Sequence, residues 1–204
     1  MELASKTLVL ATGNAGKVRE LKELFQQVPF ELKSLGDFGD IVDVDETGST
    51  FRENAELKAS GFAVQTLHLS LADDSGLEVE ALGNAPGVYS ARFAGADSGF
   101  DEKISRLLLL LDATNDAARR ARFVCVMSLA DADGRVVYTA EGACPGSIAQ
   151  APRGDNGFGY DPIFIPDGFE ETFGELPDHV KKKISHRAKA AELIIRYLLD
   201  FIAV

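Results

Sequence analysis

A glycine- and lysine-containing segment near the start of the sequence has residue types suited to binding phosphate. Thr12–Lys17 reads Thr-Gly-Asn-Ala-Gly-Lys and lies between an apolar run at residues 7–11 and apolar residues at helical spacing, which predicts a strand, a turn and a helix N-terminus. Helix N-terminal amides attract phosphate, glycines let the backbone approach it, and Lys17 supplies a positive charge. The spacing of a Walker A loop is absent, so an ordinary turn with a solvated lysine explains this segment equally well.

Adjacent carboxylates provide a second candidate site. Asp73 and Asp74, followed by Ser75, come directly after an apolar run at residues 69–72 that predicts a strand. Ligands of α/β sheets gather at the carboxyl ends of strands, and carboxylates are among the hard oxygen ligands that Mg²⁺ prefers. Glu46, in an acidic loop, is a possible further ligand. An Asx-type turn is the competing interpretation, because Asp-Ser-Gly is common in turns.

A third candidate combines aromatic rings with glycines. Phe158, Gly159, Tyr160 and Asp161 follow one another directly after Gly157. Small residues beside an aromatic ring leave a platform on which a nucleotide base can stack, and such stacking contributes about 1–3 kcal/mol per base. Asp161 could accept hydrogen bonds from base N–H groups. A turn whose aromatic rings are anchored in the core is compatible with the same residues.

Basic residues form a fourth candidate before the predicted C-terminal helix. Lys181–Lys183 precede Ser185, His186 and Arg187. Cations near a helix N-terminus oppose its dipole, so a ligand that carries an anion or a carbonyl group would explain the cluster. A solvated basic patch explains at least some of the lysines. The spacing of the His and Cys residues does not match a zinc site.

The elements that must position these segments alternate between strands and helices. Strands are predicted at residues 7–11, 30–34, 69–72, 77–79, 123–129 and 136–141, and helices at about 16–27, from Phe51 onward, at 101–111 and after Ser185. Thr50 and Glu53 have the spacing of a capping box. We therefore expect a mixed α/β fold in one continuous domain, residues 1–204, with two lobes around a central cleft.

The composition excludes several classes of protein. A formal net charge of -11 argues against a nucleic-acid-binding scaffold, because binding to a phosphate backbone needs a basic surface. The longest aliphatic run, Leu107–Leu111, is far below the ~20 residues of a membrane span. The chain has only Cys125 and Cys144 as cysteines, which favours a reduced, cytoplasmic setting.

Taken together, the segments resemble the non-canonical purine NTP pyrophosphatases, also called ITP/XTP pyrophosphatases. The resemblance runs nearly the whole chain and includes LVLATGNAGKVREL (residues 8–21), ETGSTFRENAELKA (46–59), ADDSGLEV (72–79), PGVYSARFAG (86–95), RGDNGFGYDPIF (153–164) and ISHRAKA (184–190). Each motif is short, but six in this order are very specific. The resemblance implies an ITPase-like fold, a homodimer, and Mg²⁺-dependent cleavage of the α–β phosphoanhydride of ITP, dITP and XTP, with release of pyrophosphate.

The resemblance also implies a role for each candidate residue. Asp74 would be the catalytic carboxylate, directing water at the α-phosphorus, and would hold the metal with Glu46; Asp73 lies beside them. The implied substrate contacts are Thr12, Gly13, Asn14, Ala15, Gly16, Lys17, Lys58, Ser75, Phe158, Gly159, Tyr160, Asp161, Lys181, His186 and Arg187. Lys181 aligns best with the family lysine, with Lys182 and Lys183 as alternatives.

Two other functions remain possible on the sequence alone. A pyrophosphatase for pyrimidine triphosphates would share the phosphate loop and the carboxylates but would need a different base pocket. A nucleotide sensor would bind nucleotide without releasing pyrophosphate, yet it would have no need of the acidic residues. For a purine substrate, donors from His186, Arg187 or the nearby backbone would pair with the 6-oxo group of hypoxanthine or xanthine and would confront the 6-amino group of adenine.

Overall fold

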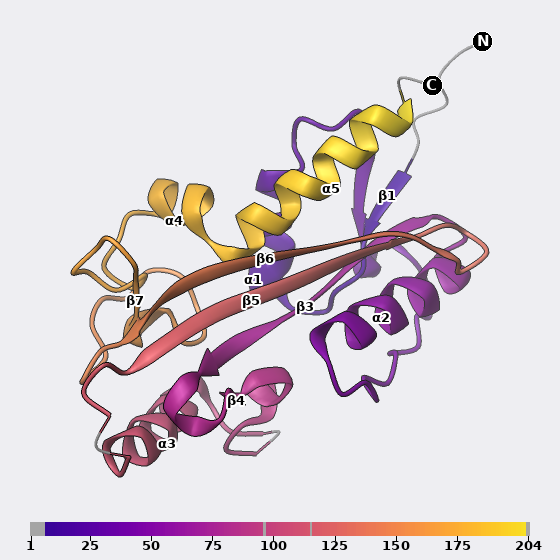
Figure 1. Cartoon of the computed structure of the whole chain (residues 1–204). Coiled ribbons are helices and arrows are strands. Elements are labelled where there is room, and N and C mark those ends of the chain that lie inside the picture. The colour runs from indigo at the N-terminus through magenta and orange to yellow at the C-terminus, as the bar shows by residue number, and fades with distance from the viewer. Residues whose placement is uncertain (1–6, 96, 115, 203–204) are drawn as a thin grey trace. The chain divides into compact units, whose positions relative to one another are not determined.

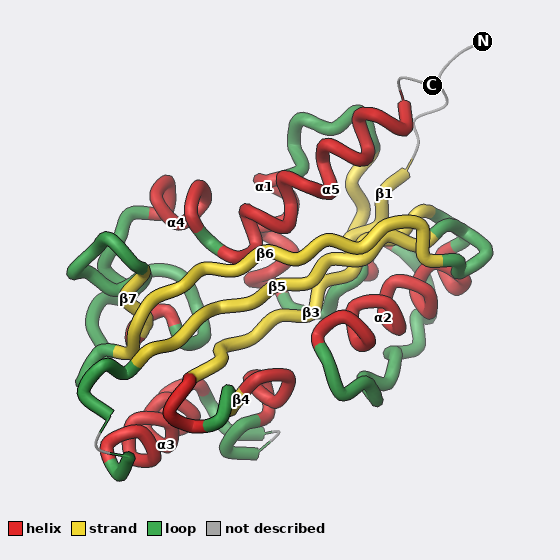
Figure 2. Tube along the Cα trace, viewed as in Figure 1, coloured by secondary structure: helices red, strands yellow, loops and turns green. Residues whose placement is uncertain are grey.

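The computed structural model describes residues 7–95, 97–114 and 116–202, and it confirms the predicted mixed α/β fold (Figures 1 and 2). The strands of the sheet have the order β2-β1-β3-β5-β6-β7, and β4 pairs with β3. The strands are β1 (Thr7–Leu10), β2 (Glu31–Ser34), β3 (Leu69–Val79), β4 (Ala85–Pro86), β5 (Arg120–Ala130), β6 (Val136–Ile148) and β7 (Phe164–Pro166). The pairing is mixed, because β1 is parallel to β2 and β3, whereas β4 and β7 pair antiparallel.

Five α-helices accompany the sheet in the described residues. They are α1 (Ala15–Leu24), α2 (Phe51–Thr66), α3 (Phe100–Asp112), α4 (Asp178–Ile184) and α5 (His186–Ile202). Short 3-10 turns lie at Leu35–Asp37, Glu80–Leu82, Gly87–Arg92 and Asp161–Ile163. None of the described helices is both long and apolar enough to cross a membrane.

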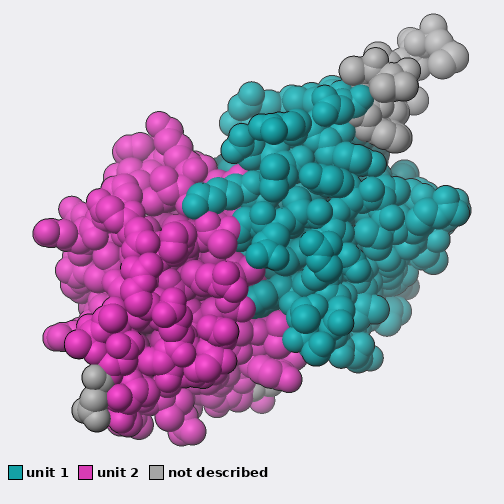
Figure 3. Space-filling model, in the orientation of Figure 1, with its two compact units in different colours: residues 1–74, 125–142, 189–204 teal, residues 75–124, 143–188 magenta. Residues whose placement is uncertain are grey.

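The chain forms two compact units, which are coloured separately in Figure 3. Unit 1 comprises residues 1–74, 125–142 and 189–204, and unit 2 comprises residues 75–124 and 143–188. The long strands β3, β5 and β6 each contribute residues to both units. Each unit has its own hydrophobic core.

In unit 1, helices cover both faces of the sheet, and the strand residues alternate between them. Leu71 belongs to the core that α1 and α5 complete, whereas its neighbour Ala72 belongs to the core beneath α2. This alternation is the period of a strand, in which successive side chains point to opposite faces. The face on which any residue of β3 lies therefore follows from its place in the sequence.

Specific caps fix the starts of α1 and α2. Asn14 Oδ1 accepts a hydrogen bond from the Lys17 backbone N–H and so caps α1. The predicted capping box of α2 is confirmed, because Thr50 accepts from the Glu53 N–H while the Glu53 carboxylate accepts from the Thr50 N–H. Both caps satisfy helix N–H groups that have no partner within the helix.

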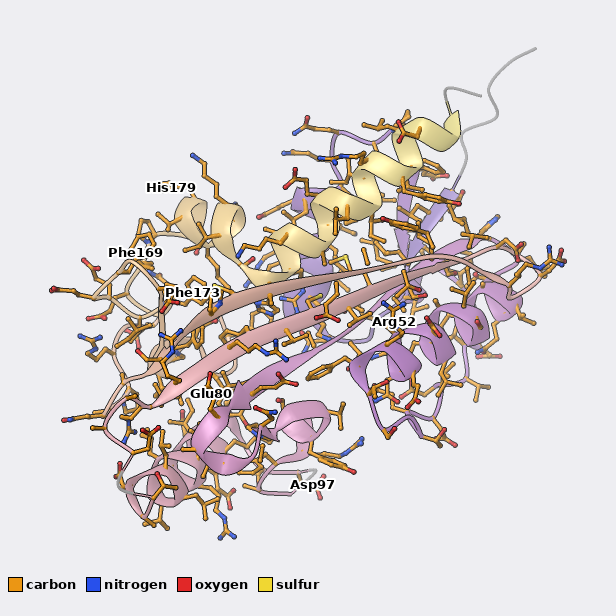
Figure 4. All side chains as sticks on the ribbon, in the orientation of Figure 1. Arg52, Glu80, Asp97, Phe169, Phe173 and His179 are labelled. Carbon is orange, nitrogen blue, oxygen red and sulfur yellow. The ribbon has the colours of Figure 1, made fainter. Side chains whose placement is uncertain are left out.

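The core of unit 2 is rich in aromatic rings. Phe123 and Phe164 lie with their ring centroids 4.5 Å apart, and Phe173, labelled in Figure 4, packs against both rings. Helix α3 adds aliphatic side chains, including the fully buried Leu107 and Leu111. The ring contacts thus join β5, which carries Phe123, to β7, which begins at Phe164.

Two predictions about local structure were wrong. Asp73–Gly76 do not form a turn after a strand, because β3 continues through them to Val79. Lys181–Lys183 do not precede the N-terminus of the last helix directly, because they form the last turn of α4. Cations at a helix C-terminus are favourable, so the dipole argument for a ligand near these lysines does not hold.

Candidate functional site

The Thr12–Lys17 loop runs from the end of β1 into the first turn of α1 in unit 1, as predicted. Besides the cap from Asn14, the Asn14 backbone N–H donates to Thr12 Oγ1 at 3.2 Å, so the loop holds its own shape. Among the described residues, no atom lies within 4 Å of the place where Gly13 would carry a Cβ. The loop therefore presents exposed backbone beside a helix N-terminus, an arrangement suited to an anion. Thr12, Gly13 and Ala15 line a surface pocket of about 560 Å³ together with later residues of α1 and with Ser34–Gly36.

Asp73 and Asp74 lie on opposite faces of the sheet, because they are consecutive residues of β3. The Asp73 carboxylate is buried and its Oδ2 lies 3.0 Å from Lys17 Nζ, which ties the strand to the first turn of α1. Asp74 faces α2 instead, where Lys58 lies. The two carboxylates therefore have different lysine partners within one unit.

Lys58 joins two carboxylates on the α2 side of the sheet. Its Nζ lies 3.3 Å from Asp74 Oδ1 and 3.2 Å from Glu46 Oε1. Burial by itself would lower the pKa of Lys58, but the charges of Asp74, Asp73 and Glu46 outweigh burial and raise this pKa above its usual value. Lys58 is therefore a firmly charged ammonium group, suited to binding phosphate oxygens.

The pKa of Asp74 is raised, whereas a simple ion pair with a lysine would lower it. Burial and the nearby charge of Glu46 raise the pKa of Asp74, while Lys58, Lys17 and a hydrogen bond from Asn54 partly oppose the rise. A buried carboxylate with a raised pKa is a better proton acceptor than an exposed one, and such groups are often found at functional sites. Asp74 therefore has the properties of a group that activates water.

The carboxylates of Glu46 and Asp74 are of the type that binds a magnesium ion. In the part of the chain that the structure describes, no group of three or more His, Cys, Asp or Glu side chains converges on a single point. The two carboxylates nonetheless already share one cationic partner, Lys58. Mg²⁺ is commonly held by one or two carboxylates together with water and substrate phosphates. The donor set therefore fits a metal that binds together with a phosphorylated substrate.

In unit 2, Asp161 fixes the position of the neighbouring aromatic segment. Its Oδ2 accepts hydrogen bonds from the Phe158 backbone N–H at 2.7 Å and from Lys181 Nζ at 2.6 Å. The Lys181 ammonium also lies 4.8 Å from the centroid of the Phe158 ring. Gly157 allows this packing, because a Cβ at that position would lie only 2.0 Å from Asp161 Oδ2. The partly buried Phe158 ring is therefore held by a buried ion pair.

His186 and Arg187 begin α5 and are both almost fully buried in unit 2. The His186 ring stacks on Phe123, with the centroids 4.7 Å apart and an interplanar angle of 12°. Arg187 Nη2 donates to Ser75 Oγ at 2.9 Å, and its guanidinium carbon lies 5.7 Å from the Phe158 ring centroid. Lys181 and Arg187 thus both lie near the Phe158 ring, whereas His186 packs on Phe123.

Tyr160 has the character of a core residue. Its hydroxyl donates to the Ser90 backbone carbonyl oxygen at 3.0 Å, and its ring makes an edge-on contact with Phe100. Burial raises the pKa of Tyr160 far above the usual value, so the phenol stays protonated. A Cβ at Gly159 would lie 3.5 Å from the Phe100 ring, an ordinary packing distance.

The other two histidines of the chain, His68 and His179, lie outside these groups of candidate residues. His68 makes a tilted ring contact with Phe38, with the centroids 5.7 Å apart. His179 is exposed on α4 (Figure 4).

The structure thus gathers the candidate residues into two groups, one in each unit. The group in unit 1 consists of the Thr12–Lys17 loop, Glu46, Lys58, Asp73 and Asp74, and the group in unit 2 consists of Ser75, Phe158, Gly159, Tyr160, Asp161, Lys181, His186 and Arg187. Asp74 and Ser75 are consecutive residues of β3, so one strand contributes to both groups.

Three neighbours of these groups were missed from the sequence. Asn54 donates to Asp74, Gly48 donates to Asn54, and Phe123 supports His186. Asn54 carried a signal, since a polar residue on the buried face of an amphipathic helix needs an explanation. Nothing in the sequence indicated the role of Phe123, because its type and position do not distinguish it from the other apolar residues of the strand.

The sequence and the fold of the chain are similar to those of known proteins. The model of the Ham1 family matches residues 8–197. The dITP/XTP pyrophosphatase of Desulforamulus reducens is 47% identical over 191 residues, 94% of each chain, and that of Geobacillus kaustophilus is 50% identical over 185 residues, 91% of this chain and 90% of the relative. A solved structure of a HAM1 protein from Coxiella burnetii superimposes with a TM-score of 0.88 at 41% identity, covering 96% of this chain and 99% of the other. The chain belongs to the Ham1 family.

Proposed function

We propose that this protein hydrolyses the non-canonical purine nucleoside triphosphates ITP, dITP and XTP to the nucleoside monophosphate and pyrophosphate. The relatives named dITP/XTP pyrophosphatases, which match at nearly half of all positions, support the reaction and the substrates. The structural observation that carries the proposal is that the buried Lys58 contacts both the buried Asp74 and the half-buried Glu46, while Lys17 contacts Asp73, the residue before Asp74. Such hydrolysis removes nucleotides that would otherwise be misincorporated into DNA and RNA.

The residues of unit 1 would bind and cleave the triphosphate. The amides at the start of α1, Lys17 and Lys58 meet its negative charge, as helix N-termini and cations commonly do. Asp74 orients a water molecule toward the α-phosphorus and accepts its proton, for which the raised pKa suits it. Pyrophosphate leaves with its charge met by the lysines. Most of the catalysis is positioning and electrostatic stabilisation, as in phosphoryl transfer generally.

Glu46 and Asp74 would hold Mg²⁺, the cofactor of the proposed reaction. When bound, the metal would neutralise charge on the phosphate oxygens and on the departing pyrophosphate. The shared contact of the two carboxylates with Lys58 supports this assignment. On substrate binding, Lys58 would then turn from the carboxylates to the phosphate oxygens.

The residues of unit 2 would recognise the base. Phe158 offers a ring face for stacking, and the donors of Lys181, His186 and Arg187 suit the 6-oxo group of hypoxanthine or xanthine. Adenine places an amino group at the same point, and a buried donor facing a donor leaves both without a partner. Such a mismatch can discriminate strongly between substrates.

A pyrophosphate-release assay tests the function and the specificity together. ITP, XTP, GTP, ATP and dUTP would be compared with and without Mg²⁺. We expect kcat/KM for ITP and XTP to exceed that for ATP by at least about 100-fold, in line with discrimination by an unpaired buried donor. Equal values for all purines would refute the specificity. Preference for dUTP would favour the pyrimidine alternative, and nucleotide binding without pyrophosphate release would favour a sensor.

The variant Asp74→Asn tests the catalytic residue. The amide keeps the size of the side chain but cannot accept the proton, so we expect kcat for ITP to fall by about 10²–10⁴-fold. The far-UV circular dichroism spectrum should be unchanged. A variant with near-normal kcat would remove Asp74 from the catalytic role.

The proposal extends to assembly and location. We propose a homodimer, a single functional domain over residues 1–204 and a cytoplasmic setting. The composition supports a reducing compartment, because the chain has two cysteines, Cys125 and Cys144, too few for a disulfide framework. Light scattering coupled to size-exclusion chromatography measures the oligomeric state, and a mass of about 22 kDa, that of one 21.9 kDa chain, would contradict the dimer.

A further inference from the structure

We propose that Asn54 is a positioning residue that sets the location of Asp74 relative to Glu46. The inference rests on the proposed function, because it concerns how these two carboxylates are held for catalysis. Asn54 lies on α2 and is completely buried. Its side chain contacts the Asp74 carboxylate at one end and the loop that carries Glu46 at the other.

The hydrogen bonds of Asn54 define the orientation of its amide. The Gly48 backbone N–H, 2.8 Å away, needs an acceptor, which only the amide oxygen Oδ1 can provide. The nitrogen Nδ2 must then face Asp74, where it donates to Oδ2 at 3.2 Å. One donor and one acceptor of the same rigid group thereby connect β3 to the loop of Glu46.

Gly48 extends this connection toward the metal-binding carboxylate. It lies two residues after Glu46, so fixing the Gly48 amide restricts where the Glu46 side chain begins. A Cβ on Gly48 would lie 2.7 Å from Asn54 Oδ1 and 2.6 Å from Glu53 Cβ, closer than real Cβ atoms approach other atoms. The hydrogen bond therefore needs glycine at position 48, because any side chain there would push the Asn54 amide away.

The first turn of α2 holds Asn54 rigidly. The capping box of Thr50 and Glu53 fixes the helix start, and Ser49 donates a backbone and a hydroxyl hydrogen bond to the same Glu53 carboxylate. The Asn54 backbone N–H donates to the Thr50 carbonyl oxygen at 3.2 Å. Asp74 Oδ1, on the other side, meets Lys58 one turn further along the same helix. Both oxygens of Asp74 are thus held from α2.

The residue type is difficult to explain by stability alone. Asparagine is a weak helix former, and a buried amide gives no more than a modest net gain from its hydrogen bonds. The neighbouring positions on this face of α2, Phe51, Ala55 and Ala59, are apolar and buried. An apolar side chain would pack there, but it would remove the hydrogen bonds to the Gly48 N–H and to Asp74 Oδ2 and could not direct Asp74.

Variants of Asn54 and of Gly48 test the inference. Asn54→Ala removes both hydrogen bonds, Asn54→Asp keeps an acceptor for Gly48 but turns an oxygen toward Asp74, and Gly48→Ala displaces the amide without altering Asn54. We expect each to lower kcat for ITP by about 10- to 100-fold, the effect of losing a hydrogen bond to a charged group. KM should change less than about threefold, and the Mg²⁺ concentration for half-maximal rate should rise.

A second measurement uses the metal-free protein without nucleotide. Hydrogen exchange followed by NMR reports on the Gly48 amide directly, because its hydrogen bond to Asn54 Oδ1 protects it. We expect this protection to be lost in Asn54→Ala and retained in Asn54→Asp, while the amides later in α2 stay protected in both. This readout does not depend on catalysis.

Two matched controls separate positioning from general damage to α2. Arg52→Ala alters an exposed residue of the same helix (Figure 4), and Thr66→Val removes a buried hydroxyl that bonds to the Phe62 carbonyl oxygen. We expect Thr66→Val to lower the unfolding temperature, and neither control to change kcat by more than about twofold.

Three results would decide the matter. Near-normal kcat in Asn54→Ala, with Gly48 unprotected, would overturn the inference. A loss of kcat in Thr66→Val as large as that in the Asn54 variants would also overturn it, because general destabilisation would then explain both. If wild-type protein released no pyrophosphate, the proposed function would fail instead, and the exchange of Gly48 would still show whether Asn54 holds the loop.

Discussion

Replacing Gly157 with alanine should weaken unit 2 and the platform for the base at the same time. Gly157 has a φ angle of +74°, and its missing Cβ leaves the space that Asp161 Oδ2 occupies. An alanine Cβ would lie 2.0 Å from that oxygen, so the carboxylate must move. Its hydrogen bonds from the Phe158 N–H and from Lys181 would then lengthen or break.

The size of the effect follows from two contributions. Alanine in the left-handed region costs roughly 1–2 kcal/mol. Losing one hydrogen bond to the buried Asp161 carboxylate costs about 1.5–3 kcal/mol more. The free energy of unfolding should therefore fall by about 4 kcal/mol, which for a chain of this size corresponds to a fall in Tm of roughly 8–16 °C.

Gly83 provides a matched control for the backbone contribution. It lies in the same unit with a φ of +64°, but no described atom lies within 4 Å of its missing Cβ. Gly83→Ala should therefore cost only about 1–2 kcal/mol. Thermal and urea unfolding measure both variants, and steady-state kinetics should show a raised KM for ITP in Gly157→Ala alone. Equal losses of stability in the two variants, with unchanged KM, would refute the role assigned to Asp161.

Two further predictions concern the support of His186 and the cap of α2. Phe123→Leu removes the ring on which His186 stacks, so kcat/KM for ITP should fall by about 3- to 10-fold, the equivalent of one aromatic contact; a value like that of the wild type would exclude this support. Hydrogen bonds from the Ser49 side chain and backbone lower the pKa of Glu53 below its usual 4.5, so its contribution to stability is present above that pH and is lost as the pH falls through the lower folded-state value. Urea unfolding at pH 7 and pH 3 should therefore show a smaller loss of stability on acidification for Glu53→Gln than for wild type; identical losses would contradict the assigned hydrogen bonds.

Much of the fold could be predicted from sequence, because it depends on local patterns. The strand, loop and helix around Thr12–Lys17 followed from apolar periodicity, and the start of α2 followed from Thr50 and Glu53. The error at Asp73–Gly76 has a physical cause. Asp-Ser-Gly favours turns, but here the pairing of β3 in the sheet and the burial of both carboxylates override that local preference.

The site could be predicted less completely, because its geometry depends on contacts distant in sequence. The chemical types of Lys17, Lys58 and Asp74 were evident, whereas the division of two adjacent carboxylates between two lysines was not. That division arises from the alternation of a strand whose continuation was not predicted. The roles of Asn54 and Phe123 depend on what packs against them, and no spacing in the sequence records those neighbours.

The alternation of β3 has a consequence for how related sequences can vary in length. Deleting or inserting a single residue between Leu71 and Asp73 would turn every later side chain of the strand over, exchanging the partners of Asp73 and Asp74. A change of two residues would restore the faces but shift both carboxylates by about 7 Å along the strand. Gaps in an alignment of homologues should therefore avoid Leu69–Val79 and gather in connections outside the family motifs, such as the turn between β5 and β6.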